Sequence, residues 1–227
     1  MVKRGLLIRA ALVIVALVFI ALFCRVTVVP DAVPSMAVND EGKLVAVKEL
    51  SLPEAYVQDN WETKMLPAIG ERAIDPAAFA EGMKADLAAL GVKYATRANE
   101  TSPWSFCLKG KVKVLGMENA DSRTRTRLLV DVHPYDGEPD MKVQISTVIR
   151  TNAIRDAVGF LKLDDFTNQV EFAELTKVFN ARVQKDVLQN LDAEALVGKE
   201  IELTGCVSVG KQDEEVLVVP VRIVTDE

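Results

Sequence analysis

Apolar residues change their spacing along the chain, and each change marks a new segment. The N-terminus carries a continuous apolar run, the next structured part repeats apolar side chains every three or four positions, and the C-terminal half alternates apolar with polar ones. A period near 3.6 predicts helices, and a period of two predicts strands. We therefore expect a membrane anchor or signal segment over residues 1–25, a linker over 26–50, a helical region over 51–100 and a β-domain over 101–227.

Capping signals predict two helices in the helical region. Ser51 precedes an apolar stripe and is followed three positions later by Glu54, which is the spacing of a capping box. Pro67 is expected to end this first helix. Asp75, which is followed by a proline, is typical of the start of the next helix, and Gly91 is typical of a residue just past a helix end.

Five strands and one long helix are predicted for the β-domain, so the expected fold class is α+β. The helix spans Thr167–Leu191 and separates the third strand from the fourth. Three strands, a helix and two strands form the element order of an OB-fold, a small five-stranded Greek-key barrel. Pro220, inside the last strand, favours a sheet edge or a bulge. The predicted strands are WSFCLKGKVKVLGM (104–117), TRTRLLVDVH (124–133), MKVQISTVI (141–149), KEIELTGCVSV (199–209) and VLVVPVRIV (216–224).

Two cysteines lie in this β-domain, Cys107 in the first strand and Cys206 in the fourth. The first and fourth strands of an OB-like barrel are neighbours, which brings the two side chains within reach of each other. A disulfide and two separate buried thiols are both compatible with this placement.

The apolar run from Ala10 to Cys24 is 15 residues long, about 22 Å of helix. Extending it back to Leu6 gives 19 residues and about 28 Å, close to the hydrocarbon thickness of a bilayer. We expect a retained single-pass helix in the bacterial inner (cytoplasmic) membrane. A cleaved signal peptide and lipid attachment at Cys24 are the alternatives, although Phe23 stands where lipid signals have a small residue.

Charge separates the N-terminal segment from the rest of the chain. Residues 1–25 hold four bases and no acid, which places the N-terminus in the cytoplasm and the following domain in the periplasm or exterior. Residues 26–227 hold 23 bases and 33 acids, so this part lacks the basic footprint of a nucleic-acid-binding protein. No phosphate-binding loop, nucleotide fingerprint or nucleophile elbow occurs. We expect neither an enzyme nor a bound cofactor or metal.

A polar corner between the third strand and the long helix holds the candidate binding residues. Guanidinium, carboxylate and amide groups together suit a sugar or a carboxylate ligand. A structural role is the alternative, in which Asp165 caps the long helix and Arg155 pairs with a carboxylate. The candidates are Arg150, Asn152, Arg155, Asp156, Asp165, Asn168 and Gln169.

The same stretch, VIRTNAIRDAVGFLKLDDFTNQVEFAEL, resembles a bacterial family of predicted periplasmic lipoproteins, the domain of unknown function 2291. The segments Ala153–Asp156 and Asp165–Gln169 carry most of the likeness. This chain has Thr151 and Asn152 where family members often have Gly-Thr. The resemblance implies an accessory of sugar importers of the ATP-binding-cassette (ABC) type, by association with neighbouring genes.

These observations favour a membrane-anchored extracytoplasmic accessory that acts by binding. Its expected partners are the membrane, through the N-terminal helix, and components of an ABC-type importer or a sugar-binding protein. One alternative is an independent module that binds a small polar molecule or glycan through the Arg155–Gln169 corner. A structural envelope protein is the second alternative.

Overall fold

The computed structural model describes residues 51–225 except 120 and 123, together with two short strands before them, β1 (Ser35–Val38) and β2 (Leu44–Val47). The chain falls into two compact units, residues 1–49 and 50–227. In the first unit β1 pairs antiparallel with β2. The predicted anchor over residues 1–25, including Cys24, lies outside the described residues. Of the described helices, none has the length and apolar character needed to cross a membrane.

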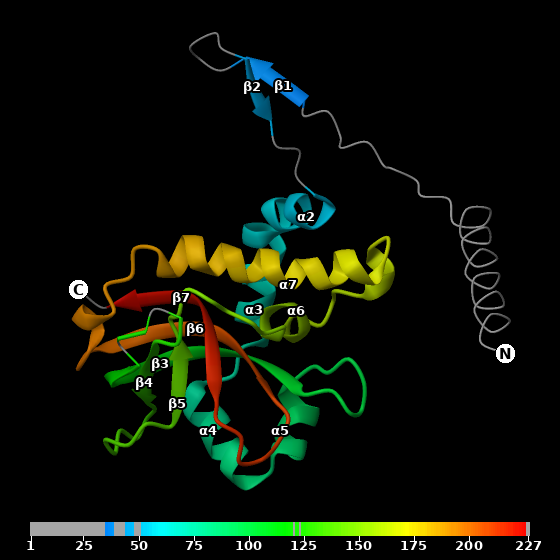
Figure 1. The fold of residues 1–227 in the computed structure, drawn as a ribbon. Helices are drawn as coiled ribbons and strands as arrows, with labels where there is room; N and C mark the ends of the chain where they lie inside the picture. Colours follow the sequence, from blue (N-terminus) through cyan, green and yellow to red (C-terminus); the bar gives the residue numbers. More distant parts are fainter. Residues whose placement is uncertain (1–34, 39–43, 48–50, 120, 123, 226–227) are drawn as a thin grey trace, which may run out of the picture. The chain divides into compact units, whose positions relative to one another are not determined.

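The second unit is a closed barrel of five strands in the order β3-β4-β5-β7-β6, with helices around it (Figure 1). The prediction of an α+β, OB-like barrel is confirmed, as is the pairing of the first strand with the fourth. Its strands are β3 (Trp104–Glu118), β4 (Arg127–Asp131), β5 (Met141–Gln144), β6 (Glu200–Val209) and β7 (Leu217–Thr225). Its helices are α2 (Leu52–Asn60), α3 (Leu66–Arg72), α4 (Pro76–Ala85), α5 (Leu87–Tyr94), α6 (Ala153–Ala157) and α7 (Gln169–Val183).

One hydrophobic core fills the barrel and continues into α4 and α5, which cover one end of it (Figure 1). Val112 and Val114 of β3 are fully buried inside, as the alternating pattern predicts. Phe106 of β3 meets Phe79 of α4 edge to face, with ring centroids 5.1 Å apart. This contact joins the barrel interior to the helical cover.

A second core lies between the outer face of the barrel and a layer made by α2, α3, α6 and α7. Cys107 of β3 and Val219 of β7 face this layer, and Trp61 packs on Phe179 of α7 with ring centroids 5.9 Å apart. Because helices cover the outer face here, β3 is buried on both sides from Ser105 to Leu108.

Two strand predictions concern the seam between β5 and β7. β5 ends at Gln144 rather than Ile149, because its parallel pairing with β7 covers only Lys142 and Val143 and leaves the following residues without a strand partner. Pro220 is predicted to lie at a sheet edge or a bulge, and the structure shows the bulge. The β6–β7 register shifts at the residue pair that includes Pro220.

The first predicted helix begins as expected, with the Ser51–Glu54 capping box in place. The prediction that Pro67 ends it is wrong. The chain passes through a π-helical turn, Trp61–Met65, directly into α3, where Pro67 occupies the first turn and needs no intrahelical N–H bond. The buried stripe Val57, Trp61, Met65 and Ile69 has a strict four-residue spacing, longer than the 3.6-residue α period, and the π turn absorbs the excess.

The second predicted helix is two helices. Asp75 caps α4 as expected, but α4 ends at Ala85. The side chain of the next residue, Asp86, accepts a bond from Ala89 N–H and caps α5. Gly91 is therefore inside α5 rather than past its end. An added Cβ at Gly91 would lie 2.4 Å from the Trp104 ring, so this glycine permits close approach of the helix to β3.

We predict that Gly91→Ala lowers the free energy of unfolding by about 1–3 kcal/mol, because the new methyl group forces the buried contact with Trp104 apart. Gly70→Ala is the matched control: Gly70 is also helical, but nothing lies within 4 Å of its added Cβ. That substitution should raise stability by up to about 1 kcal/mol, since alanine favours helix more than glycine does. Urea unfolding measures both. Equal effects of the two substitutions would contradict the packing explanation.

Candidate functional site

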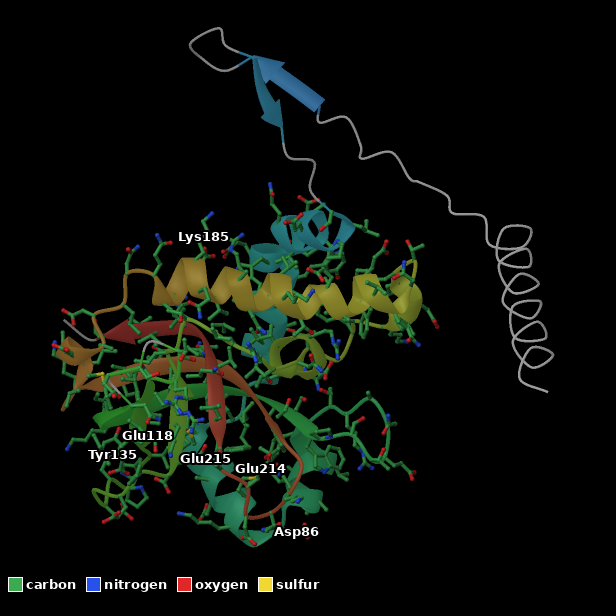
Figure 2. All side chains as sticks on the ribbon, viewed as in Figure 1. Asp86, Glu118, Tyr135, Lys185, Glu214 and Glu215 are labelled. Atoms are coloured by element: carbon green, nitrogen blue, oxygen red, sulfur yellow. The ribbon has the colours of Figure 1, made fainter. Side chains whose placement is uncertain are left out.

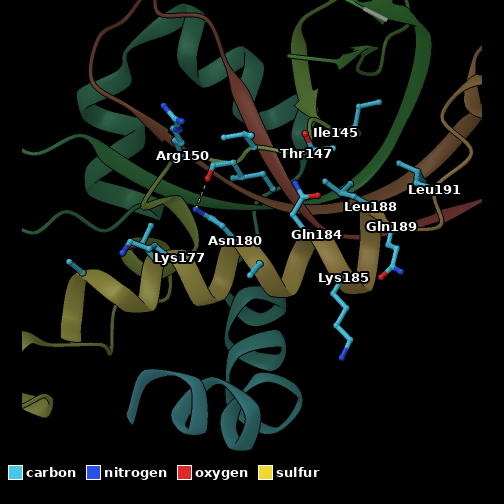
Figure 3. A pocket seen from close by; sticks show the side chains of 15 residues that line it. Ile145, Thr147, Arg150, Lys177, Asn180, Gln184, Lys185, Leu188, Gln189 and Leu191 are labelled. Carbon is cyan, nitrogen blue, oxygen red and sulfur yellow. Dashed lines mark hydrogen bonds between the residues drawn. The ribbon is translucent and has the colours of Figure 1, made fainter. Parts of the chain in front are cut away.

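A groove of about 1260 Å³ runs between α7 and the segment that joins β5 to α6 (Figure 3). Its lining extends along the helix from Ala173 to Gln189, through the π-helical turn Gln184–Leu188. At about 1.5 Å per residue this is a length of about 24 Å. Ile145 and Val148 supply apolar surface from the opposite wall. The groove therefore has the shape of an elongated channel on the outside of the barrel.

Polar side chains of α7 hold the opposite wall in place. Asn180 Nδ2 donates hydrogen bonds to the carbonyl oxygens of Ile149 and Thr151, each at 3.2 Å, and Gln184 donates to the carbonyl of Ser146. These bonds take the place of the strand pairing that stops at the end of β5. The wall is irregular backbone that owes its position to the helix.

Asn180 also leaves one polar atom without a partner. Its residue is 6% exposed, and its Oδ1 has no hydrogen-bond partner. Asp131 Oδ1 is the other such atom among the described side chains. An unpaired buried acceptor costs about 1–3 kcal/mol of folding free energy, so the fold keeps Asn180 beside the groove at the cost of the hydrogen bonds that its Oδ1 would make with water.

The charged residues that line the groove are all positive. Arg150, Lys177 and Lys185 contribute three cations and the remaining lining residues include no acid, although the chain as a whole carries −6. Lys177 is 2.6 Å from Glu174, whereas Arg150 and Lys185 are exposed. Figure 3 shows the Lys185 side chain extending away from the opposite wall, so Lys185 lies at the rim of the groove. The potential in the groove therefore favours a ligand that carries negative charge.

The face on which OB-folds bind ligands, formed by the second and third strands and two flanking loops, has a different character here. It holds a cavity of about 740 Å³ lined by Thr124 of the β3–β4 loop, Gln144 of β5 and Glu215 of the β6–β7 loop, and it shares Arg150 with the α7 groove. No aromatic side chain lines it. Stacking of bases or sugar rings, the usual use of this face, has no platform there.

Four charged side chains close a ring on the same face. Lys142 Nζ lies 2.8 Å from Glu118 and 2.6 Å from Glu215, and Arg127 lies 2.6 Å from Glu215 and 3.4 Å from Glu118. Figure 2 labels the two acids on the barrel. The hydrogen bond from Lys142 and the Arg127 charge lower the pKa of Glu215, and the bonds to Glu118 and Glu215 raise the pKa of Lys142. The ring ties together β3, β4, β5 and the β6–β7 loop.

The structure separates the residues of the predicted polar corner into three places: the α7 groove, α6 with the residue before it, and the segment at the start of α7. Arg150 lines the α7 groove. Asn152 accepts a hydrogen bond from Thr176 of α7 at 3.0 Å and thereby fixes the start of α6. Arg155 and Asp156 lie on α6, at a smaller cavity of about 250 Å³.

Arg155 is engaged by its own neighbours. Its Nε donates to Asp156 Oδ1 at 2.7 Å, its guanidinium lies 4.4 Å above the Phe172 ring, and its side chain is 13% exposed. These contacts match the pairing expected of a structural Arg155, and a ligand there would compete with them.

The last three corner residues lie at the start of α7. Asp165 does not cap that helix. It accepts a bond from Lys162 N–H and closes a short 3-10 turn, Leu163–Asp165. Asn168 is the cap, accepting from the N–H groups of Val170 and Glu171, because its side chain reaches the first free amides while Asp165 lies a turn too early. Gln169 is exposed in the first turn.

Cys107 and Cys206 stand directly opposite each other on β3 and β6, both buried and both free thiols. Among the described residues, no group of three or more His, Cys, Asp and Glu side chains is arranged so that it could hold a metal ion.

Comparison with known proteins identifies a family and a fold. A family model described as a predicted periplasmic lipoprotein, domain of unknown function 2291, matches residues 16–224. The crystal structure of an OB-fold protein from Thermotoga maritima is similar, with a TM-score of 0.64 and 19% sequence identity over 78% of this chain and 100% of that one. At this identity the likeness shows the fold alone. No curated protein matches the chain.

Sequence reasoning missed most of the α7 groove. Lys177, Gln184 and Lys185 lie in the predicted long helix and are not among the candidate residues, and Val148 is placed in the third predicted strand. One signal was present: Asn180 interrupts the buried stripe of α7 between Phe179 and Val183, and a buried amide requires partners from another segment.

We predict that Lys142→Met lowers the free energy of unfolding by about 1 kcal/mol near pH 7, in the upper range for a partly exposed ion-pair network. The pKa of Glu215 is lowered in the folded state, so its contribution is present above its ordinary value of 4.5 and is lost as the pH falls through the folded pKa. The difference between wild type and variant should therefore shrink as the pH falls below 4.5. Urea unfolding across this range measures it, with the exposed Lys199→Met as control. A difference that is constant with pH would contradict the ring's role.

Proposed function

The chain belongs to the family of predicted periplasmic lipoproteins called domain of unknown function 2291, and from this we propose that it is a membrane-tethered extracytoplasmic protein that binds a partner protein through the α7 groove. The observation that best supports this proposal is the lining of the groove. It is about 24 Å long and contains three cations and no acid, in a chain of net charge −6. It acts by binding rather than by catalysis.

The shape of the groove favours a protein segment over a small molecule. A channel that follows four turns of a helix offers successive contacts to an amphipathic helix or an extended chain, the arrangement of helix-in-groove recognition. Ile145, Val148 and Leu188 supply apolar contacts, and Lys185 and Arg150 supply charge. We therefore propose an occupant that carries acidic and apolar residues in one segment.

A component of an ABC-type importer is the partner that the family resemblance suggests. That identity rests on the resemblance alone, and the groove supports only the chemistry of the segment. The rival site, the Arg155–Gln169 corner, is less well supported, because Arg155 is already paired with Asp156 and stacked on Phe172.

We predict that a photo-crosslinking amino acid at Lys185 or Gln189, in the full-length chain in native membranes, captures the same importer component. Gln169 is the matched control, because it is exposed on the same helix at the opposite end and outside the groove. Adding Lys185→Glu to the Gln189 crosslinker should reduce capture about fivefold, equivalent to about 1 kcal/mol of binding free energy. Mass spectrometry of the adducts identifies the partner.

Three outcomes would count against this function. Different proteins captured from the two groove positions would mean incidental contacts. Capture from Gln169 as efficient as from Lys185 would move the site to the corner. Without any capture, a structural role in the envelope would gain support.

The tether is proposed to be a lipid on Cys24, in keeping with the family's description, with a retained helix over residues 1–25 as the alternative. We predict that the wild-type chain incorporates labelled fatty acid and that Cys24→Ser does not, while Cys107→Ser remains labelled. An unlabelled wild-type chain that keeps residues 1–23, found by N-terminal sequencing, would contradict lipidation and leave the helix as anchor.

A further inference from the structure

Backbone direction fixes the geometry of the Cys107–Cys206 pair. The Cys107 carbonyl accepts a hydrogen bond from Ile74 N–H at 2.9 Å, and Lys109 N–H donates to the Ile74 carbonyl at 3.1 Å. Two residues earlier, Ser105 exchanges both of its backbone bonds with Thr96. In an extended strand the N–H and C=O of one residue point the same way, so these β3 residues all point away from β6.

The two cysteines therefore occupy a non-hydrogen-bonded position of the antiparallel ladder. In such positions the Cα atoms of opposite residues are only about 4.5 Å apart and their side chains are closest. Disulfides span Cα separations of about 4.4–6.8 Å. The register thus places Cys107 and Cys206 within bonding distance without any shift of the strands.

The surroundings of the pair protect it from solvent. Cys107 is 1% exposed and Cys206 is 0% exposed, on the barrel face that α6 covers. The Cys107 thiol donates to the Ala157 carbonyl of α6 at 3.7 Å. Reagents reach either sulfur only while α6 is away from the barrel.

The two thiols also differ in acidity. The hydrogen bond from Cys206 and the Arg72 charge lower the pKa of Cys107, whereas its hydrogen bond to Cys107 and burial raise the pKa of Cys206. In the folded chain Cys107 therefore carries the larger share of thiolate, the reacting form of a cysteine.

We propose that Cys107 and Cys206 form a structural disulfide that joins the first and fourth barrel strands once the chain has left the cytoplasm. The oxidant is the disulfide of a thiol–disulfide oxidoreductase of the periplasm. The thiolate of one of the two cysteines attacks that disulfide and gives a mixed disulfide, and the other cysteine then attacks the sulfur of the first. Two thiols of this chain become one disulfide, the oxidant's disulfide becomes two thiols, and both protons end on the oxidant's sulfurs.

Burial sets the order of events. The bond forms while the paired β3 and β6 strands are exposed, before α6 docks, and the docked helical layer then shields it from reductants. It closes a loop of about 100 residues that contains β4, β5, α6 and α7, and in the chain-entropy account a long loop is the case in which cross-linking restricts the unfolded chain most.

Peptide mapping tests the proposal directly. The full-length exported chain is denatured, its free thiols are alkylated, and it is digested with trypsin without reduction. Cleavage after Arg97, Lys109, Lys199 and Lys211 places each cysteine in its own peptide, 98–109 and 200–211, and separates both from Cys24. We expect these two peptides as one linked species that reductant splits. Recovery of both as separate alkylated peptides, or of either linked to another protein, would overturn the proposal.

Thermal unfolding tests the structural role. The oxidised wild-type chain should melt about 10 °C above the same chain after reduction. The double variant Cys107→Ala/Cys206→Ala should match the reduced wild type and show no response to reductant. A linked pair whose reduction leaves the melting temperature unchanged would overturn the claim that the bond stabilises the barrel.

Discussion

The ten-residue pairing of β3 with β6 is the constraint on which the rest of this structure depends. The inner faces of these strands fill the barrel, and their outer faces support the helical layer, so one pair of strands belongs to both hydrophobic cores. Full burial on both sides demands apolar or well-paired residues at consecutive positions, which explains the run from Ser105 to Leu108. A fault in this pairing would disturb the barrel and the α7 groove together.

The elements that local chemistry specifies could be predicted from the sequence. Ser51 and Asp75 cap helices as expected, because a side-chain oxygen meets free backbone amides within three residues. Val112 and Val114 alternate with lysines and point into the barrel. The order of strands then implies the OB-like topology, and with it the neighbourhood of Cys107 and Cys206.

The errors fall where distant segments decide the outcome. Gly91 looks like a helix stop, yet it lies inside α5, and it is a glycine there because the Trp104 ring occupies the space a side chain would take. Pro67 looks like a terminator, but a π turn keeps the stripe from Val57 to Ile69 buried and carries the helix on. The α7 groove exists because Asn180 holds a segment some 30 residues away, a contact that no local pattern reveals.

The short β5–β7 pairing gives the barrel an unequal resistance to opening. Only Lys142 and Val143 join β5 to β7, whereas six residues of β6 pair with β7. The barrel is thus mechanically a five-stranded sheet that is closed along one weak line, between β5 and β7. The cavity lined by Gln144 and Leu217 straddles that line, and the adjoining wall of the α7 groove begins there. An occupant that touches both sides would add its binding energy to the closing of the barrel, so occupancy and rigidity would rise together.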